Sequence, residues 1–163
     1  MNINKTALIA DIIAHLTVEL ERCEQAARNA HLAATDDQNV AETQYDTLAI
    51  ESAYLAEGQS RRIIECHHAI KAFVQLKETI DSIGTDKISE GNLVQLGEDE
   101  AKNHWYFIAP AAAGYRTLIS NERISVITKN APIGKMLIGK AKGDEIFLSL
   151  PNHSIDDEVI SIY

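Results

Sequence analysis

Apolar residues recur every three or four positions through the first half of the chain. The spacing fits one face of an α-helix, and neither proline nor glycine occurs before Gly58. The stripe consists of Ile9, Ile12, Leu16, Leu20, Cys23, Ala27, Ala30 and Ala34. This periodicity predicts a long amphipathic helix whose apolar face narrows to alanine toward its C-terminal end.

A second stripe with alternating steps of three and four follows a polar interruption, as in a coiled-coil seam. It consists of Ala41, Tyr45, Leu48, Ser52, Leu55, Gln59, Ile63, Cys66, Ile70, Phe73, Leu76 and Ile80. The second helix should run to about Ser82 and end near Gly84. Neither helix can bury its apolar face alone, so the two are expected to fold back as an antiparallel coiled-coil hairpin, residues 1–84, with its tip near residues 35–40.

The second half of the chain changes to a period of two, which is typical of short strands. Six segments show it: NLVQLGE, HWYFIAP, YRTLIS, ISVIT, EIFLSL and EVISIY. Between the fourth and fifth, Pro132 to Ile138 reads as a short apolar helix, with Gly139 as its stop. This pattern predicts a compact α+β domain over residues 88–163.

Composition and charge narrow the possible functions. The 163 residues carry a net charge of −9, so the chain lacks a basic footprint for duplex DNA. No apolar run reaches the roughly 18–20 residues of a membrane span, and the N-terminus does not resemble a secretory signal. Two cysteines do not suggest a disulfide framework. We therefore expect a cytoplasmic protein that makes no membrane contact and no sequence-specific DNA contact.

The polar interruption, ATDDQNVAETQYD, carries four acids and no base. Asp36 or Asp37 could be a turn residue that caps the second helix, with Glu42 in its favourable first turn. Metal binding by the same carboxylates is the other possibility.

The segment SVITKNAPIGKMLIGKAKGDEI, Ser125 to Ile146, resembles the C-terminal signature of the GreA/GreB transcript cleavage factor family. The matching residues are Ala131-Pro132, Ile138-Gly139-Lys140 and Gly143-Asp144. The final DEVISIY resembles the last strand of those proteins. The resemblance implies an N-terminal helical hairpin followed by a small FKBP-like domain of antiparallel sheet with one short helix.

The resemblance also implies a mechanism. The C-terminal domain of such bacterial factors docks on the rim of the RNA polymerase secondary channel, and the hairpin enters the channel. Acidic tip residues then help to hold the second catalytic Mg²⁺ and orient a water, so that the polymerase cuts backtracked RNA. The chain would not itself be an enzyme and would need no cofactor beyond the polymerase's Mg²⁺. We expect a monomer that contacts RNA polymerase directly and nascent RNA only indirectly.

The family carries an acidic pair spaced D-x-x-E at the tip. Counting back without a gap from Glu57-Gly58 places the glutamate at Glu42 and an asparagine, Asn39, where the aspartate should be. The candidate cleavage-assisting residues, and the candidates for supporting the polymerase's Mg²⁺, are therefore Asp37 and Glu42. Asp36 and Asn39 are their neighbours. A channel blocker without cleavage activity, like regulators of nucleoside diphosphate kinase, and a peptide-binding adaptor unrelated to transcription are the alternatives.

Partner contact is expected around the short helix, at Ile133, Lys135, Met136 and Lys140. Met136 could instead be core, and the lysines could be ordinary surface residues.

Other candidate sites are weak. No nucleophile with a base, glycine-rich phosphate loop or metal cluster is evident. In a hairpin centred near Asp37, Cys23 and Cys66 should lie about 20 Å apart along the rod, as separately buried thiols. In the strand that contains Trp105, Tyr106 and Phe107, alternate members should fill the core.

Overall fold

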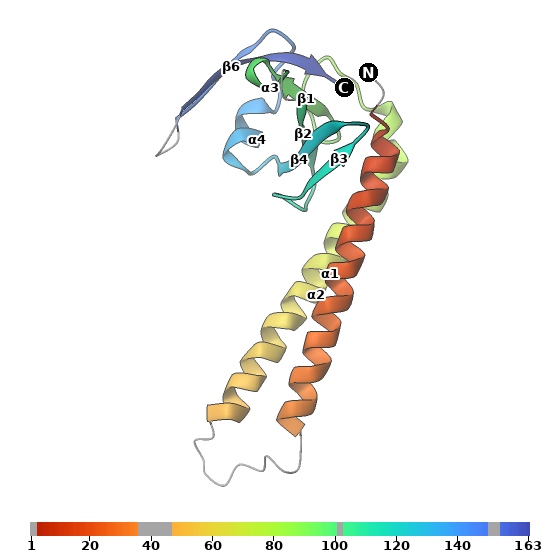
Figure 1. Cartoon of the computed structure of the whole chain (residues 1–163), viewed down its shortest axis with the longest axis vertical. Coiled ribbons are helices and arrows are strands. Elements are labelled where there is room, and N and C mark those ends of the chain that lie inside the picture. The colour runs from red at the N-terminus through yellow and green to blue at the C-terminus, as the bar shows by residue number, and fades with distance from the viewer. Residues whose placement is uncertain (1–2, 36–46, 101–102, 150–153) are drawn as a thin grey trace. The chain divides into compact units, whose positions relative to one another are not determined.

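A computed structural model describes residues 3–35, 47–100, 103–149 and 154–163 (Figure 1). Contacts divide the chain into two compact units, one formed by Ile13–Lys71 and the other by Met1–Ile12 together with Ala72–Tyr163. The predicted domain ranges, 1–84 and 88–163, stay a prediction. The elements are α1 (Lys5–Thr35), α2 (Thr47–Thr79), a 3₁₀ turn (Ile80–Ser82), β1 (Leu93–Leu96), α3 (Gly97–Glu100), β2 (His104–Ala109), β3 (Arg116–Ile119), β4 (Glu122–Thr128), α4 (Pro132–Leu137), β5 (Glu145–Ser149) and β6 (Ser154–Ile162).

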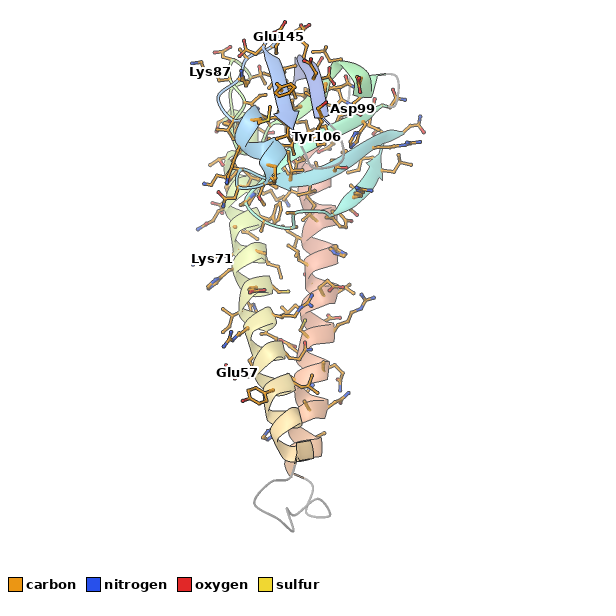
Figure 2. All side chains as sticks on the ribbon, turned by 90° about the vertical axis from the view of Figure 1, so that its left-hand side faces the viewer. Glu57, Lys71, Lys87, Asp99, Tyr106 and Glu145 are labelled. Carbon is orange, nitrogen blue, oxygen red and sulfur yellow. The ribbon has the colours of Figure 1, made fainter. Side chains whose placement is uncertain are left out.

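The unit formed by Ile13–Lys71 contains most of α1 and α2, which lie side by side in both views (Figures 1 and 2). On α1, Leu16 and Cys23 of the predicted stripe are buried. On α2, Ile63 is partly buried, whereas Leu55 is 56% exposed. Polar side chains such as Glu57 and Lys71 are exposed. The two predicted helices are thus confirmed, and the apolar stripe of α2 is less well covered near its N-terminal end. None of the described helices contains an apolar stretch that could span a bilayer.

The two cysteines of this unit are free; Cys23 is buried as predicted, whereas Cys66 is only partly buried. Burial raises the pKa of the Cys66 thiol, and the neighbouring Cys23 thiol raises it further. A separation of about 20 Å is therefore wrong, because charge effects of this kind require groups that lie near one another. The physical reason is the link: α1 ends at Thr35 and α2 begins at Thr47, so the hairpin is centred several residues beyond Asp37.

The six predicted strands form one sheet in the order β3-β4-β2-β1-β6-β5. Four of its five pairings are antiparallel, but β2 and β4 are parallel, from His104↔Arg123 to Ala109↔Thr128. The expectation of a purely antiparallel sheet is corrected at this pair. The reason is that β3 pairs with β4 at the sheet edge, so the chain reverses twice after β2 and β4 runs in the direction of β2. The α+β fold class itself is confirmed.

One hydrophobic cluster lies where α4 packs against the sheet. It contains Ile88, Val94, Leu96, Ile108, Leu137, Ile146 and Val159, with Met136 and Ile133 packed against it. Along β2, Trp105 and Phe107 are buried at 3% and 0% exposure while Tyr106 is only partly buried. The predicted alternation in this strand is confirmed. The ends of both long helices belong to the same unit, and their residues Leu8, Ile9 and Phe73 are buried, as is Ile80 in the 3₁₀ turn that follows α2.

Candidate functional site

The predicted tip residues Asp36, Asp37, Asn39 and Glu42 lie outside the described residues. They fall in the segment between the end of α1 at Thr35 and the start of α2 at Thr47. Their roles stay a prediction. The candidate residues that the structure describes all lie in the sheet domain.

The helix α4 is fixed by two residues of the sequence signature. Pro132 occupies its first turn after Ala131, whose backbone is extended, which suits a ring with a preset φ and no amide hydrogen. Gly134 is buried, and a methyl group there would collide with the backbone carbonyl of Thr128. Only glycine allows this close approach between α4 and the end of β4. The signature residues therefore place α4 against the sheet.

The loop after α4 is anchored to the segment that precedes β1. The backbone of Ile88 donates to the Lys140 carbonyl at 2.8 Å and accepts from the Gly139 amide at 2.8 Å. Gly139 adopts φ +81°, which favours glycine, and the Asp144 carboxylate accepts a hydrogen bond from the Ala141 amide at 2.8 Å. These residues of the signature build a rigid loop, so their chemistry is structural.

The predicted partner-contact residues divide into two groups. Met136 and Lys140 line a shallow groove of about 380 Å³, together with Glu145, Ile146, Phe147 and Asp156. Ile133 is partly buried against the hydrophobic cluster, and Lys135 is exposed; neither lines the groove. The Lys140 ammonium donates to the Glu145 carbonyl at 3.2 Å, which holds it at the rim.

Two exposed apolar residues, one on β5 and one directly after α4, were missed as candidates from the sequence. Phe147 is 64% exposed on β5, and Ile138, at the end of α4, is 39% exposed. The alternation of side chains along β5 already indicated that Phe147 would be exposed. Ile146 is 2% exposed, so its neighbour Phe147 points away from the core at the rim of the groove. We call Met136, Ile138, Lys140 and Phe147 the α4–β5 surface.

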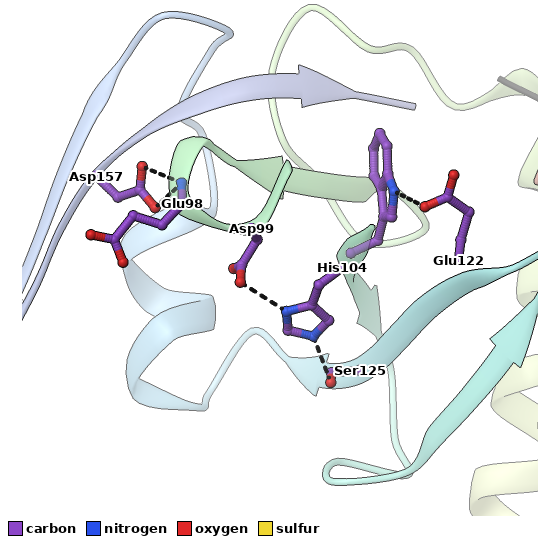
Figure 3. Close-up of polar contacts among 7 residues, drawn as sticks. Glu98, Asp99, His104, Glu122, Ser125 and Asp157 are labelled. Carbon is purple, nitrogen blue, oxygen red and sulfur yellow. Dashed lines mark hydrogen bonds and ion pairs between the residues drawn. The ribbon is translucent and has the colours of Figure 1, made fainter. Parts of the chain in front are cut away.

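A chain of polar side chains crosses from α3 to β4 (Figure 3). An Asp99 carboxylate oxygen lies 3.2 Å from Nδ1 of His104, and Nε2 of His104 lies 2.9 Å from the Ser125 hydroxyl. The Asp99 and His104 side chains are only 13% and 20% exposed. The Tyr106 ring meets the imidazole edge-on, with centroids 4.6 Å apart. Because the carboxylate faces Nδ1, that nitrogen carries a hydrogen and the ring orientation is fixed.

This arrangement corrects the expectation that no hydroxyl would be paired with a base. Ser125 and His104 are 21 residues apart in the sequence. The parallel pairing of β2 with β4 brings them together, with Tyr106 opposite Ser125. No spacing rule could have found the pair, because the sequence suggested no parallel strands.

The same surroundings alter the titration of Tyr106. Burial, reinforced by the Asp99 carboxylate, raises the pKa of Tyr106 from 10 to about 12. The folded-state pKa lies above the unfolded value, so the protonated phenol contributes stability that is fully present below pH 10 and lost between pH 10 and about 12. Burial and a hydrogen bond to Asp11 also raise the pKa of Tyr115. Absorbance titration of phenolate formation should therefore show late-titrating tyrosines, one of which is lost in Tyr106→Phe. An unchanged late titration in that variant would contradict the assignment.

Among the described residues, no group of three or more His, Cys, Asp or Glu side chains could hold a metal ion.

The curated proteins that this chain matches in sequence carry the same name. No family model matches the chain. It is 31% identical over 114 residues to the transcription elongation factor GreA of Helicobacter pylori (strain ATCC 700392 / 26695), covering 68% of this chain and 66% of that protein. It is 33% identical over 78 residues to the transcription elongation factor GreA of a Nitratiruptor species, covering 48% and 45%. The chain thus spans between about half and two thirds of the length of these curated relatives.

Solved structures give a weaker likeness. The GreA factor homolog 1 (Gfh1) of Thermus thermophilus shares 17% identity, with 93% of this chain and 94% of that chain covered and a TM-score of 0.36. The Gfh1 of Thermus aquaticus shares 18% identity, with 92% of each chain covered and a TM-score of 0.34. These scores are too low to bear on function.

Proposed function

The chain belongs to the GreA/GreB family of transcription elongation factors, and from this premise we propose that it binds RNA polymerase and regulates transcript elongation. The observation that carries the proposal is the sequence match to GreA over 68% of the chain. The α4–β5 surface supports it, because it offers a place for a protein partner to dock. The protein would act in the cytoplasm, as a regulator without catalytic activity of its own.

The docking step would use the α4–β5 surface. Phe147 and Ile138 are exposed apolar side chains, and an aromatic residue beside a groove is the kind of anchor that dominates protein interfaces. Lys140 and the exposed Lys135 would steer the domain toward an acidic surface on the polymerase. By the family resemblance, that surface is the rim of the secondary channel.

The hairpin would then enter the channel. With about 1.5 Å of rise per residue, the 31 residues of α1 extend about 45 Å, which suits a rod that reaches a buried site. Asp37 and Glu42 would lend carboxylate oxygens toward the second Mg²⁺ of the polymerase, a metal that prefers such ligands. Asp36 and Asn39 are the neighbouring candidates.

The alternative within the same site is occupation without cleavage. Asn39 stands where the family has an aspartate, and an amide brings no negative charge to the metal. A protein with this tip would compete for the channel and leave backtracked RNA uncut.

The docking surface can be tested directly with purified RNA polymerase from the source organism. Phe147→Glu is expected to weaken binding about tenfold or more, since it replaces the apolar anchor by a charge. Leu118→Glu is the matched control, because Leu118 is also exposed, at 63%, but lies on β3 at the other edge of the sheet. Binding would be measured by interferometry on immobilised polymerase.

Two outcomes would contradict the proposal in different ways. Failure of the unmodified protein to bind polymerase would reject the function and favour the peptide-binding adaptor. Equal weakening by Phe147→Glu and Leu118→Glu would still support the proposed polymerase-binding function. It would contradict the assignment of docking to the α4–β5 surface. A natively folded far-ultraviolet spectrum for both variants is required for either conclusion.

A further inference from the structure

The polar chain of Asp99, His104 and Ser125 opens on a separate pocket of about 320 Å³. His104, Arg116, Arg123, Ile124 and Ser125 line it. Strand register explains how these residues meet. Arg116 on β3 is paired with Ser125 on β4, and Arg123 on β4 is paired with His104 on β2. Paired residues and residues two apart along a strand share one face of a sheet, so all four polar side chains lie on the same face.

The charge of this pocket is positive in a protein whose net charge is −9. Arg116 and Arg123 are exposed, and among the described residues neither makes an ion pair. Elsewhere among the described residues, arginines such as Arg22 on α1 and Arg61 on α2 pair with glutamates on their own helices. Two guanidinium groups on adjacent strands thus supply forked donors without an internal acceptor.

The polar chain behind the arginines prepares a third donor. Asp99 holds the imidazole of His104, and Nε2 of the same ring holds the Ser125 hydroxyl at 2.9 Å. With its hydrogen on Nδ1, the neutral imidazole accepts at Nε2 from the Ser125 hydroxyl, so this hydroxyl donates to an anion only when it turns from the ring toward the pocket. The other titratable or charged groups near this ring are Tyr106 and, beyond it, Asp157 on β6. An anion in the pocket would therefore meet the guanidinium groups of Arg116 and Arg123 and, once its hydroxyl turns, Ser125.

We propose that this pocket binds the phosphate group of a small phosphorylated ligand. A tetrahedral phosphate matches two forked guanidinium groups and one hydroxyl better than a planar carboxylate does, because its oxygens point in different directions. The volume of about 320 Å³ suits a small molecule. A nucleic acid would need a longer row of basic side chains, and the net negative charge of the protein repels a nucleic acid.

The Ser–His–Asp order of the polar chain resembles that of a hydrolase, but the pocket favours binding over acyl transfer. A serine hydrolase needs donors aimed at the oxyanion that forms beside the serine, and backbone amides usually supply them. Here the neighbouring donors are guanidinium groups, which already stabilise an anion in its ground state. Ser125 is accordingly assigned as a ligand-binding residue.

Isothermal titration of the full chain with inorganic phosphate, at constant ionic strength, tests the proposal. The unmodified protein is expected to bind phosphate saturably. Arg116→Gln and Arg123→Gln should each weaken binding about tenfold or more, as the loss of a hydrogen bond to a charged group predicts. Arg62→Gln is the matched control, because Arg62 is exposed on α2 outside the pocket. Ser125→Ala should weaken binding by a smaller factor.

Each other outcome overturns the proposal. Absence of saturable binding, or equal weakening by Arg62→Gln, would show that phosphate is attracted only by general charge. Tight binding of a short single-stranded RNA without binding of phosphate would assign the arginines to a nucleic-acid surface. Covalent labelling of Ser125 by a fluorophosphonate would make it a nucleophile. Natively folded spectra for all four variants separate these results from misfolding, and none of the measurements depends on RNA polymerase.

Discussion

Phe107→Ala is expected to lower the free energy of unfolding of the sheet domain by about 3–5 kcal/mol, the usual cost of truncating a buried phenylalanine. Phe107 is fully buried on β2, between Leu93 of β1 and Val126 of β4. Removing its ring leaves a cavity that the flanking strands cannot close, because their hydrogen bonds fix their spacing. Urea denaturation followed by the fluorescence of Trp105, the single tryptophan, reports on this unit.

The matched control is Phe147→Ala, which removes the same side chain from a position that is 64% exposed in the same unit. Its expected loss is about 0.5 kcal/mol or less, since exposed substitutions away from special features rarely cost more. The polymerase-binding role proposed for Phe147 does not enter a denaturation experiment. Similar losses for the two variants would contradict the assignment of Phe107 to the core.

Periodicity made most of the fold predictable. In the helices, the period of 3.6 identified Ile9, Ile12 and Phe73 as core residues, and all three are fully buried. In the strands, the period of two predicted that alternate members of the Trp105–Phe107 run would be inside, and the structure buries Trp105 and Phe107. Pro132 and Gly139 marked the ends of α4 to within one residue. These signals are local, because each depends on which face of one element must be buried.

Features that depend on distant pairing could not be predicted in the same way. No feature of the β2 or β4 sequence indicates that the two strands are parallel, yet this pairing places Ser125 beside His104. The register of the two long helices depended on the length of their link, and an assumed centre near Asp37 put the cysteines too far apart. Arg116 and Arg123 lie on different strands, and only the strand register places them on one face.

The α4–β5 surface was half predictable for a related reason. The signature drew attention to Met136 and Lys140, and both line the groove. Phe147 comes from strand β5, and only the packing of α4 beside β5 brings it to the same groove. A motif names residues that are close in sequence, whereas a docking surface gathers residues that are close in space.

Asn39→Asp is expected to raise Mg²⁺-dependent cleavage of backtracked RNA about 10- to 100-fold, the range typical for groups that tune a metal site. This prediction rests on the proposed function and on the resemblance of the tip to an acidic D-x-x-E pair. An aspartate at position 39 would restore that spacing with Glu42 and add a carboxylate for the second metal of an in-line displacement. The measurement is the rate of RNA shortening in purified, stalled transcription complexes.

Gln38→Glu provides the matched control, because it adds the same charge one position away without creating the pair. Its cleavage rate should stay that of the unmodified protein, so a rise in both variants would show that charge alone matters. Glu42→Gln in the Asn39→Asp background should remove the gain, since a single carboxylate cannot replace the pair. If Asn39→Asp still competes with a cleavage factor for polymerase but cuts no faster, the missing acid does not limit cleavage, and channel blocking becomes the function of this tip.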